Sequence, residues 1–167
     1  MTETTAPATT TTQVHGIYID APAEKVWEAL TSSEYTNRYG YGGDLEFEPR
    51  VGGIYRHLTT EAMRQMGMGD VAVEATVVEI EPPHRLVLDW RAVWHDEPAS
   101  RLTYEIAQGP SGLTRVTLTH ELPESPGTAK DVAGNGDVEN GGGGWPWELA
   151  SLKTLLETGR TMTTAGA

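Results

Sequence analysis

The sequence contains no cysteine, and this absence excludes several kinds of chemistry. Disulfide bonds, catalytic thiolates and zinc sites with cysteine ligands all need the missing side chain, and a reducing compartment is the simplest setting for such a chain. Basic residues are also scarce, because 12 Lys and Arg stand against 24 Asp and Glu and leave a net charge of −12. A protein this acidic repels phosphate groups, so the composition predicts neither nucleic acids nor membranes as partners.

The first residues, MTETTAPATTTT, lack the basic region and the apolar core of a signal peptide or membrane anchor. Residues 1–12 are therefore predicted to be a disordered, Thr-rich tail, and residues 161–167 a second disordered tail. A length of 167 residues favours one domain between them, over residues 13–160. Together these features predict a cytoplasmic protein, with a monomer as the default oligomeric state.

Alternating apolar and polar residues predict an antiparallel sheet through the middle of the chain. The longest alternation places Leu86, Leu88, Trp90, Ala92 and Trp94 on one face. Comparable runs, without crossover helices after them, lie at residues 13–19, 45–48, 54–59, 71–77, 86–94, 102–106 and 116–122. The pattern predicts a curved sheet of six or seven strands in an α+β fold.

Helices are predicted after the first strand and after the last strand. After the first strand, Val26, Trp27 and Leu30 share one side of a short helix, and a second short turn of helix follows around Tyr35. Near the C-terminus, apolar residues at spacings of four, three and four predict a long amphipathic helix from Pro146 to Thr158. This stripe consists of Trp145, Leu149, Leu152 and Leu156.

The entry to the long helix is NGGGGWPWEL, in which four glycines meet two of the five tryptophans. Trp145 is predicted at the N-cap position, and Gly159 as the residue that ends the helix. Glu148 falls in the first turn, where a negative charge favours the helix dipole. The glycines predict a loose connection into a firm helix.

Two segments are candidates for the rim of a binding site. Residues 123–144 are predicted to form a mobile loop, either a functional lid or a disordered linker. Residues 59–69 contain Met63, Met66 and Met68. Methionine adapts to varied apolar shapes, which suits a binding rim, although plain core filling is the preferred interpretation.

Several segments also resemble a known family: APAEKVWEALT after the first strand, DVAVEATVVEIEPPHRLVLDWRAVW in the sheet, and GGWPWELASLKTLLETG at the end. Over about residues 14–159 they resemble the START-like, helix-grip (SRPBCC) superfamily, and particularly its branch of heat-shock-chaperone ATPase activator homologues. The resemblance implies a sheet wrapped around the C-terminal helix, with an elongated hydrophobic cavity between them. Members of the superfamily bind lipids or polyketides, cyclise aromatic polyketides, or bind a chaperone.

The GGGGWP run resembles a glycine-tryptophan-proline junction in one small group of this superfamily. That group consists of self-sacrifice proteins, which protect producers of enediyne antibiotics of the calicheamicin type. In these proteins an activated drug removes hydrogen from glycine backbone positions, so that the protein is cleaved in place of DNA. The resemblance implies a natural-product antibiotic as ligand and four sacrificial backbone candidates: Gly141, Gly142, Gly143 and Gly144.

The inward positions and the resemblance give a set of candidate cavity residues for a hydrophobic or aromatic small molecule, polyketide or enediyne-like. This set is Trp27, Trp90, Trp94, Tyr104, Leu118, His120, Trp145, Leu149 and Leu152. A well-packed core is the alternative role for the same residues.

His120 is the polar member of an otherwise apolar inward series, so it must find a hydrogen-bond partner or lose its charge. A satisfied core or cavity histidine is the preferred interpretation. Two other functions stay open: a polyketide cyclase or aromatase that uses His120 or a cavity tyrosine as acid–base group, and a co-chaperone-like interaction module. We assign no catalytic residue and no cofactor. We also assign no metal site, because the histidines show no ligand spacing.

Overall fold

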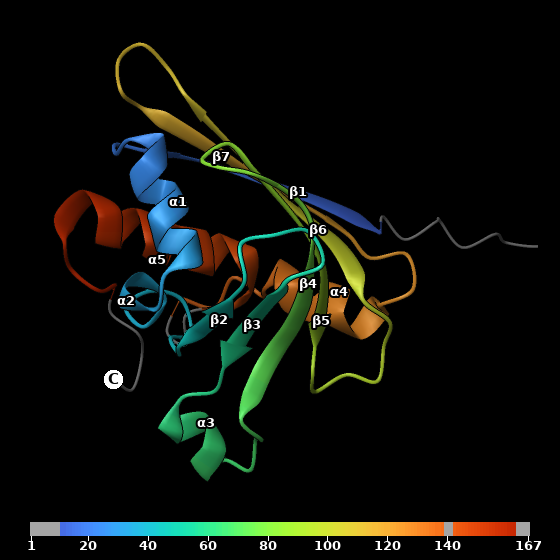
Figure 1. Ribbon diagram of the computed structural model, residues 1–167. Helices are drawn as coiled ribbons and strands as arrows, with labels where there is room; N and C mark the ends of the chain where they lie inside the picture. Colours follow the sequence, from blue (N-terminus) through green and yellow to red (C-terminus); the bar gives the residue numbers. More distant parts are fainter. Residues whose placement is uncertain (1–10, 139–141, 163–167) are drawn as a thin grey trace, which may run out of the picture.

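The computed structural model describes residues 11–138 and 142–162, which form a sheet flanked by helices (Figure 1). Most of the two predicted tails, namely residues 1–10 and 163–167, lies outside the described residues. The first strand already begins at Thr12, the last residue of the predicted N-terminal tail.

Seven strands make up the sheet within these ranges. All neighbours are antiparallel, in the order β1-β7-β6-β5-β4-β3-β2. Each strand coincides with one of the predicted alternating runs. Their bounds are β1 Thr12–Ile19, β2 Leu45–Phe47, β3 Ile54–Leu58, β4 Val71–Glu81, β5 Arg85–Ala92, β6 Ser100–Gln108 and β7 Thr114–Glu121.

Five helices accompany the sheet in the described part of the chain: α1 Ala23–Thr31, α2 Ser33–Thr36, α3 Glu61–Gln65, α4 Pro126–Ala133 and α5 Gly144–Thr158. Helix α5 packs against β1, α1 and α4. In Figure 1, α3 projects beyond the ends of β3 and β4, away from α1 and α5. The predicted α+β, helix-grip fold is confirmed, with two short helices after the first strand and a long C-terminal helix.

The core lies between the inward face of the sheet and the helices. Leu88 faces Leu102 across β5 and β6, and Tyr104 faces Leu118 across β6 and β7. These side chains form one buried cluster with the apolar stripe of α5, including Leu152. Burying one leucine side chain stabilises the fold by roughly 1.5–3 kcal/mol, so each inward leucine of the alternating runs contributes to stability.

Helix α5 starts earlier than predicted. Its N-cap is Gly143 instead of Trp145, so Trp145 lies inside the first turn. The helix ends as predicted, because Gly159 adopts the left-handed conformation (φ +74°) and its N–H donates to the carbonyl of Leu155.

The segment after β7 differs from the predicted loop, since residues 126–133 form helix α4. The carboxylate of Glu97 accepts hydrogen bonds from the backbone N–H groups of Gly127 (2.7 Å) and Thr128 (2.9 Å) and from the Thr128 hydroxyl (2.7 Å). These are the donors that a helix N-terminus leaves free. The cap comes from a loop about 30 residues away, so a local pattern could not reveal it.

The polyglycine run has a packing role where α4 meets α5. Gly134 and Gly144 approach so closely that a Cβ on Gly144 would lie 2.5 Å from the Gly134 nitrogen. The N–H of Asn135 also donates to the carbonyl of Gly142 at 2.8 Å. Residues 142–144 all have φ between +64° and +74°, a region that favours glycine. Together, residues 132–135 and 142–144 form what we call the glycine junction.

Candidate ligand-binding cavity

A cavity of about 610 Å³ lies between the sheet, α5 and the glycine junction. The volume is within the range of small-molecule sites, roughly 300–1,000 Å³. The sheet contributes Tyr55, His57, Val73, Trp90 and Tyr104 to its wall. The helix α5 and the glycine junction contribute Val132, Gly134, Asn135, Gly142, Gly144, Trp145 and Glu148, and the loop after α2 contributes Tyr39, Tyr41 and Gly42.

Four of the nine predicted cavity residues line this space: Trp90, Trp94, Tyr104 and Trp145. The other five are placed elsewhere. Leu118, His120, Leu149 and Leu152 are buried in the core, and Trp27 on α1 is a partly buried side chain packed against it. The helix stripe therefore divides between the two roles, because its first residue faces the cavity and its later leucines fill the core.

Trp94 occupies a different position from the one its parity predicts. Strand β5 ends at Ala92, so the alternation does not extend to Trp94, and its side chain is 52% exposed. The indole N–H donates to a carboxylate oxygen of Asp131 at 2.9 Å, and Nε2 of His95 lies 2.6 Å from the same oxygen. These contacts fasten α4 to the connection between β5 and β6 at the cavity rim.

The methionine segment also lies at the rim. Met63, Met66 and Met68 all line the cavity, and Met66 is 78% exposed. Part of the segment forms α3, which begins at Glu61 after the N-cap Thr60, whose side-chain oxygen accepts a hydrogen bond from the Met63 N–H. The sequence placed these residues at a candidate rim without predicting the helix.

The predicted sacrificial glycines are distributed unequally. Gly142 and Gly144 line the cavity, whereas a Cβ on Gly143 would lie 3.0 Å from the Tyr41 hydroxyl oxygen. Gly141 lies outside the described residues. The N–H of Gly144 donates to the same Tyr41 hydroxyl at 3.2 Å, which connects the junction to the opposite wall.

His120 is a fully buried histidine with both ring nitrogens in hydrogen bonds. The Trp145 indole N–H donates to Nδ1 at 3.1 Å, which requires a lone pair there and places the proton on Nε2. Nε2 donates to the Ser100 hydroxyl at 2.7 Å, and this hydroxyl donates to the Trp90 carbonyl at 3.2 Å. Burial, with a smaller contribution from His15, lowers the pKa of His120 to about 4, which keeps the ring neutral.

This chain of hydrogen bonds makes His120 a positioning residue for the aromatic wall. It holds Trp145 with its ring centroid 5.8 Å from Trp90 and 6.5 Å from Tyr104. Because both of its nitrogens are engaged and its side chain is fully buried, the arrangement gives no support to His120 as the acid–base group of a cyclase.

Glu148 is a cavity residue that the sequence analysis did not select. It lies three residues after Trp145 and four before Leu152, a spacing that places it on the buried side of α5. Its carboxyl group forms no hydrogen bond or ion pair within the described part of the chain, and burial raises its pKa to about 7. The spacing was the available signal, whereas the sequence analysis considered Glu148 only as a favourable charge in the first turn of the helix.

Three further polar side chains of the cavity wall come from β3 and β6. The hydroxyl of Tyr55 donates to the Leu30 carbonyl at 2.6 Å, so its hydrogen-bonding capacity is partly used. The Tyr104 hydroxyl has no hydrogen-bond partner among the described residues. Burial lowers the pKa of His57 to about 4, so this ring is neutral at physiological pH. The cavity is therefore aromatic and apolar, with a few polar groups available to a ligand.

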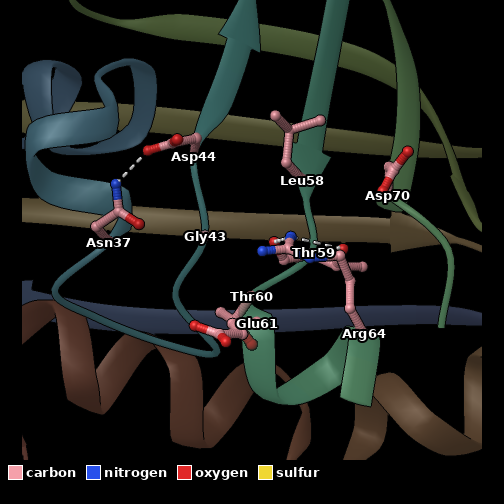
Figure 2. A pocket seen from close by; sticks show the side chains of 9 residues that line it. All are labelled: Asn37, Gly43, Asp44, Leu58, Thr59, Thr60, Glu61, Arg64 and Asp70. Carbon is pink, nitrogen blue, oxygen red and sulfur yellow. Dashed lines mark hydrogen bonds between the residues drawn. The ribbon is translucent and has the colours of Figure 1, made fainter. Parts of the chain in front are cut away.

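A second, shallower pocket of about 450 Å³ has a different character (Figure 2). It lies between the loop before β2 and helix α3, and three carboxylates line it: Asp44, Glu61 and Asp70. The side chain of Arg64 donates to the Thr59 carbonyl at 2.6 Å and is used within the pocket. Figure 2 shows Asn37 pointing toward Asp44, to which its amide donates. This polar hollow does not suit an apolar ligand.

Across residues 11–138 and 142–162, no three His, Asp or Glu side chains come together in an arrangement that could hold a metal ion. In the same ranges, no helix has the length and apolar character needed to cross a membrane.

Comparison with solved structures shows a shared fold. DynU16, a protein from the dynemicin biosynthetic locus, has a TM-score of 0.66 at 24% identity, over 90% of this chain and 49% of its own. CalU16 from Micromonospora echinospora has a TM-score of 0.53 at 21% identity, over 68% of this chain and 62% of its own. An Hsp90 activator from Plasmodium falciparum has a TM-score of 0.54 at 22% identity, over 67% and 73%. The chain thus spans about half of DynU16 and under two thirds of CalU16.

Sequence comparison identifies the family. No curated protein matches the chain. The family of activator of Hsp90 ATPase homolog 1-like proteins matches residues 20–157, from the end of β1 to the last turn of α5. The match covers the whole sheet apart from β1, and every helix described above almost completely. The protein therefore belongs to the activator of Hsp90 ATPase homolog 1-like family, within the START-like, helix-grip superfamily.

Proposed function

We propose that the protein binds a hydrophobic or aromatic natural product in the cavity between the sheet and α5, without turning it over. The observation that carries this proposal is the aromatic wall, in which the Trp145 ring lies beside those of Trp90 and Tyr104. Rigid aromatic side chains offer a large apolar contact surface at low entropic cost. The cytoplasmic location and monomeric state expected from the sequence belong to the same proposal.

Ligand binding is tested by filling the cavity. Ala72 is a buried residue of the cavity wall, whereas Ala107 is exposed on β6. We expect Ala72→Phe to weaken the binding of polyketide-like aromatic compounds at least tenfold, because the larger side chain occupies ligand space. Ala107→Phe, a matched control, should leave binding unchanged. Quenching of tryptophan fluorescence measures both, and equal affinities for the two variants would contradict the proposal.

Within this function, we propose a self-sacrifice role toward an activated enediyne. Gly142 and Gly144 line the cavity, and proteins from enediyne biosynthetic loci share the fold. A carbon radical of the drug takes a hydrogen atom from a glycine Cα, so that a C–H bond forms on the drug and a Cα radical stays on the chain. Dioxygen adds to this radical. The peroxyl group then leaves as a hydroperoxyl radical with the hydrogen of the adjacent amide nitrogen, and water hydrolyses the acylimine that remains, which breaks the backbone. The flanking amides stabilise the planar glycine radical. Because glycine has no side chain, no steric clash opposes this planar geometry.

The self-sacrifice role is tested with protein labelled with dideuterated glycine. Activated enediyne at one equivalent should acquire deuterium, and mass spectrometry should locate new chain ends within residues 141–144. Gly67 and Gly69 serve as internal controls for exposed glycines, because a Cβ added to either would meet no atom within 4 Å. An intact chain, or cleavage at these control sites as often as at the junction, would contradict the role.

A second candidate function follows from the family match over residues 20–157. The protein would then act as a co-chaperone-like module that binds an Hsp90-type chaperone and stimulates its ATPase. Pull-down of purified chaperone together with a rise in its ATPase rate would support this function. The Ala72→Phe variant separates the two functions, because filling the cavity should leave chaperone binding intact.

A further inference from the structure

We propose that the ligand of the cavity carries a basic amine, and that the carboxylate of Glu148 is the counter-ion of this amine. The inference rests on the proposed small-molecule binding and specifies the chemical class of the ligand. It depends on the place of one carboxyl group within an aromatic cavity and on the charges around it.

Glu148 is placed so that its carboxyl group meets the ligand space. It projects from the first turns of α5, three residues after Trp145, and lines the cavity. A Cβ on Gly40 would lie 2.9 Å from its Oε1 atom, so the glycine leaves room for the carboxyl group. Within the described residues it accepts no hydrogen bond, and no cation pairs with it. Its side chain is partly buried, and the apolar wall solvates an unpaired carboxylate poorly, so a cationic ligand would offset that cost.

The surrounding side chains favour a cation over an anion or a neutral group. Trp90, Trp145 and Tyr104 present aromatic rings, whose faces attract ammonium groups. Among the described lining residues, Lys130 and His57 are the basic side chains. Lys130 is exposed at the rim, and His57 is neutral because burial lowers its pKa to about 4.

The charge of the whole chain acts in the same direction. A net charge of −12 attracts cations over long distances. At the cavity rim, Asp131 adds a carboxylate that accepts from Trp94. An amine would thus be attracted by the protein as a whole, guided past the rim, and neutralised at Glu148.

The test uses three probes with the same ring system: 9-(aminomethyl)anthracene, 9-anthracenemethanol and 9-anthracenecarboxylate. At pH 8 we expect the amine to bind the wild-type protein at least tenfold more tightly than the alcohol, and the carboxylate to bind most weakly. In Glu148→Gln, the amine should lose at least tenfold in affinity while the alcohol keeps its affinity within about twofold. The alcohol therefore reports that the variant cavity is intact.

A matched variant controls for net charge. Glu124 is an exposed carboxylate outside the cavity lining, and Glu124→Gln changes the net charge by the same amount as Glu148→Gln. We expect Glu124→Gln to keep the preference for the amine. If both variants lose this preference equally, the long-range field of the protein explains it and the assignment to Glu148 is wrong.

The pH dependence gives a second readout. With a pKa of about 7, the ionised fraction of Glu148 rises about tenfold from pH 6 to pH 8, so amine affinity should rise by about the same factor. Burial raises the pKa of the cavity tyrosines and lowers that of His57, so these groups stay neutral in this window. The groups that share the cavity with Glu148 are Tyr39, Tyr41, Tyr55, His57, Tyr104, Lys130 and Asp131.

Comparison of the wild-type protein with Glu148→Gln separates the titration of Glu148 from that of the other groups. In Glu148→Gln the other groups are unchanged, and we expect the affinity for the amine to become independent of pH between 6 and 8. Equal binding of amine and alcohol by the wild-type protein would overturn the inference and leave the proposed function standing. Failure of all three probes to bind would instead overturn the proposed function, and this inference with it.

Discussion

The indole N–H of Trp145 donates to Nδ1 of His120 across 3.1 Å in the buried core. This contact joins α5 to β7, because the two residues lie on different elements and 25 positions apart. It fixes the ring of Trp145 at the point where the core ends and the cavity begins. The orientation of the aromatic wall thus depends on a polar contact within the apolar core.

Replacement of His120 by leucine should destabilise the fold by about 2–4 kcal/mol, because it leaves the Trp145 N–H and the Ser100 hydroxyl without their partner. Urea unfolding measures the loss. In a double-mutant cycle with Trp145→Phe, the second substitution removes one of the unpaired donors. We therefore expect the double variant to be at least about 0.5 kcal/mol more stable than the sum of the single effects. Strict additivity would show that the contact does not couple the two residues.

Acid should weaken the fold through His120. Its pKa falls from 6.5 to about 4 on folding, so between these values the unfolded state binds more protons. The contribution is fully present above pH 6.5, decreases as the pH falls, and amounts to about 3 kcal/mol at most. The stability difference between the wild-type protein and His120→Leu should therefore shrink by about 2–3 kcal/mol from pH 7 to pH 4. Because His57 is present in both proteins, a constant difference would contradict the assignment to His120.

Glu148 should have the opposite pH dependence. Its pKa rises from 4.5 to about 7 on folding, so the folded state binds more protons in this window. Its contribution is present below pH 4.5 and is lost as the pH rises through 7, by about 3 kcal/mol at most. Glu148→Gln should therefore become more stable relative to the wild-type protein as the pH rises from 4.5 to 8 without ligand. Thermal unfolding at both pH values checks the sign, and a relative loss of stability at pH 8 would refute it.

Substitution in the glycine junction should destabilise the fold. In Gly144→Ala the new Cβ would lie 2.5 Å from the Gly134 nitrogen and from the Val132 carbonyl, at a φ of +74°. We expect a loss of about 2 kcal/mol or more in the free energy of unfolding, from backbone strain and close contact. Gly69→Ala is the matched control, because its Cβ meets open space at an ordinary φ, and it should change stability by less than about 0.5 kcal/mol. Similar effects at both positions would show that the junction is loosely packed.

The predicted loop at residues 123–144 differs from the observed structure in a way that local sequence patterns could not reveal. Residues 126–133 look like a polar loop, yet they form α4 because Glu97 satisfies the free N–H groups of its first turn. The prediction of Trp145 as N-cap was wrong for a similar reason. The helix begins at Gly144 after the N-cap Gly143, and the close contact between Gly144 and Gly134 forms only when both segments are folded.

The sequence by itself determined the sheet, the first helices and α5, because alternation and helical periodicity are local patterns that record which side of each element avoids water. It also placed His120 and Trp145 on the inward side. Only the tertiary structure decided which inward residues fill the core and which face the cavity, since that depends on how α5 lies against the sheet. It also brought Glu148 into an aromatic cavity and gave His120 its partners on β6 and α5. The physical reason is that burial pattern is encoded along the chain, whereas empty space and hydrogen-bond pairing arise between segments distant in sequence.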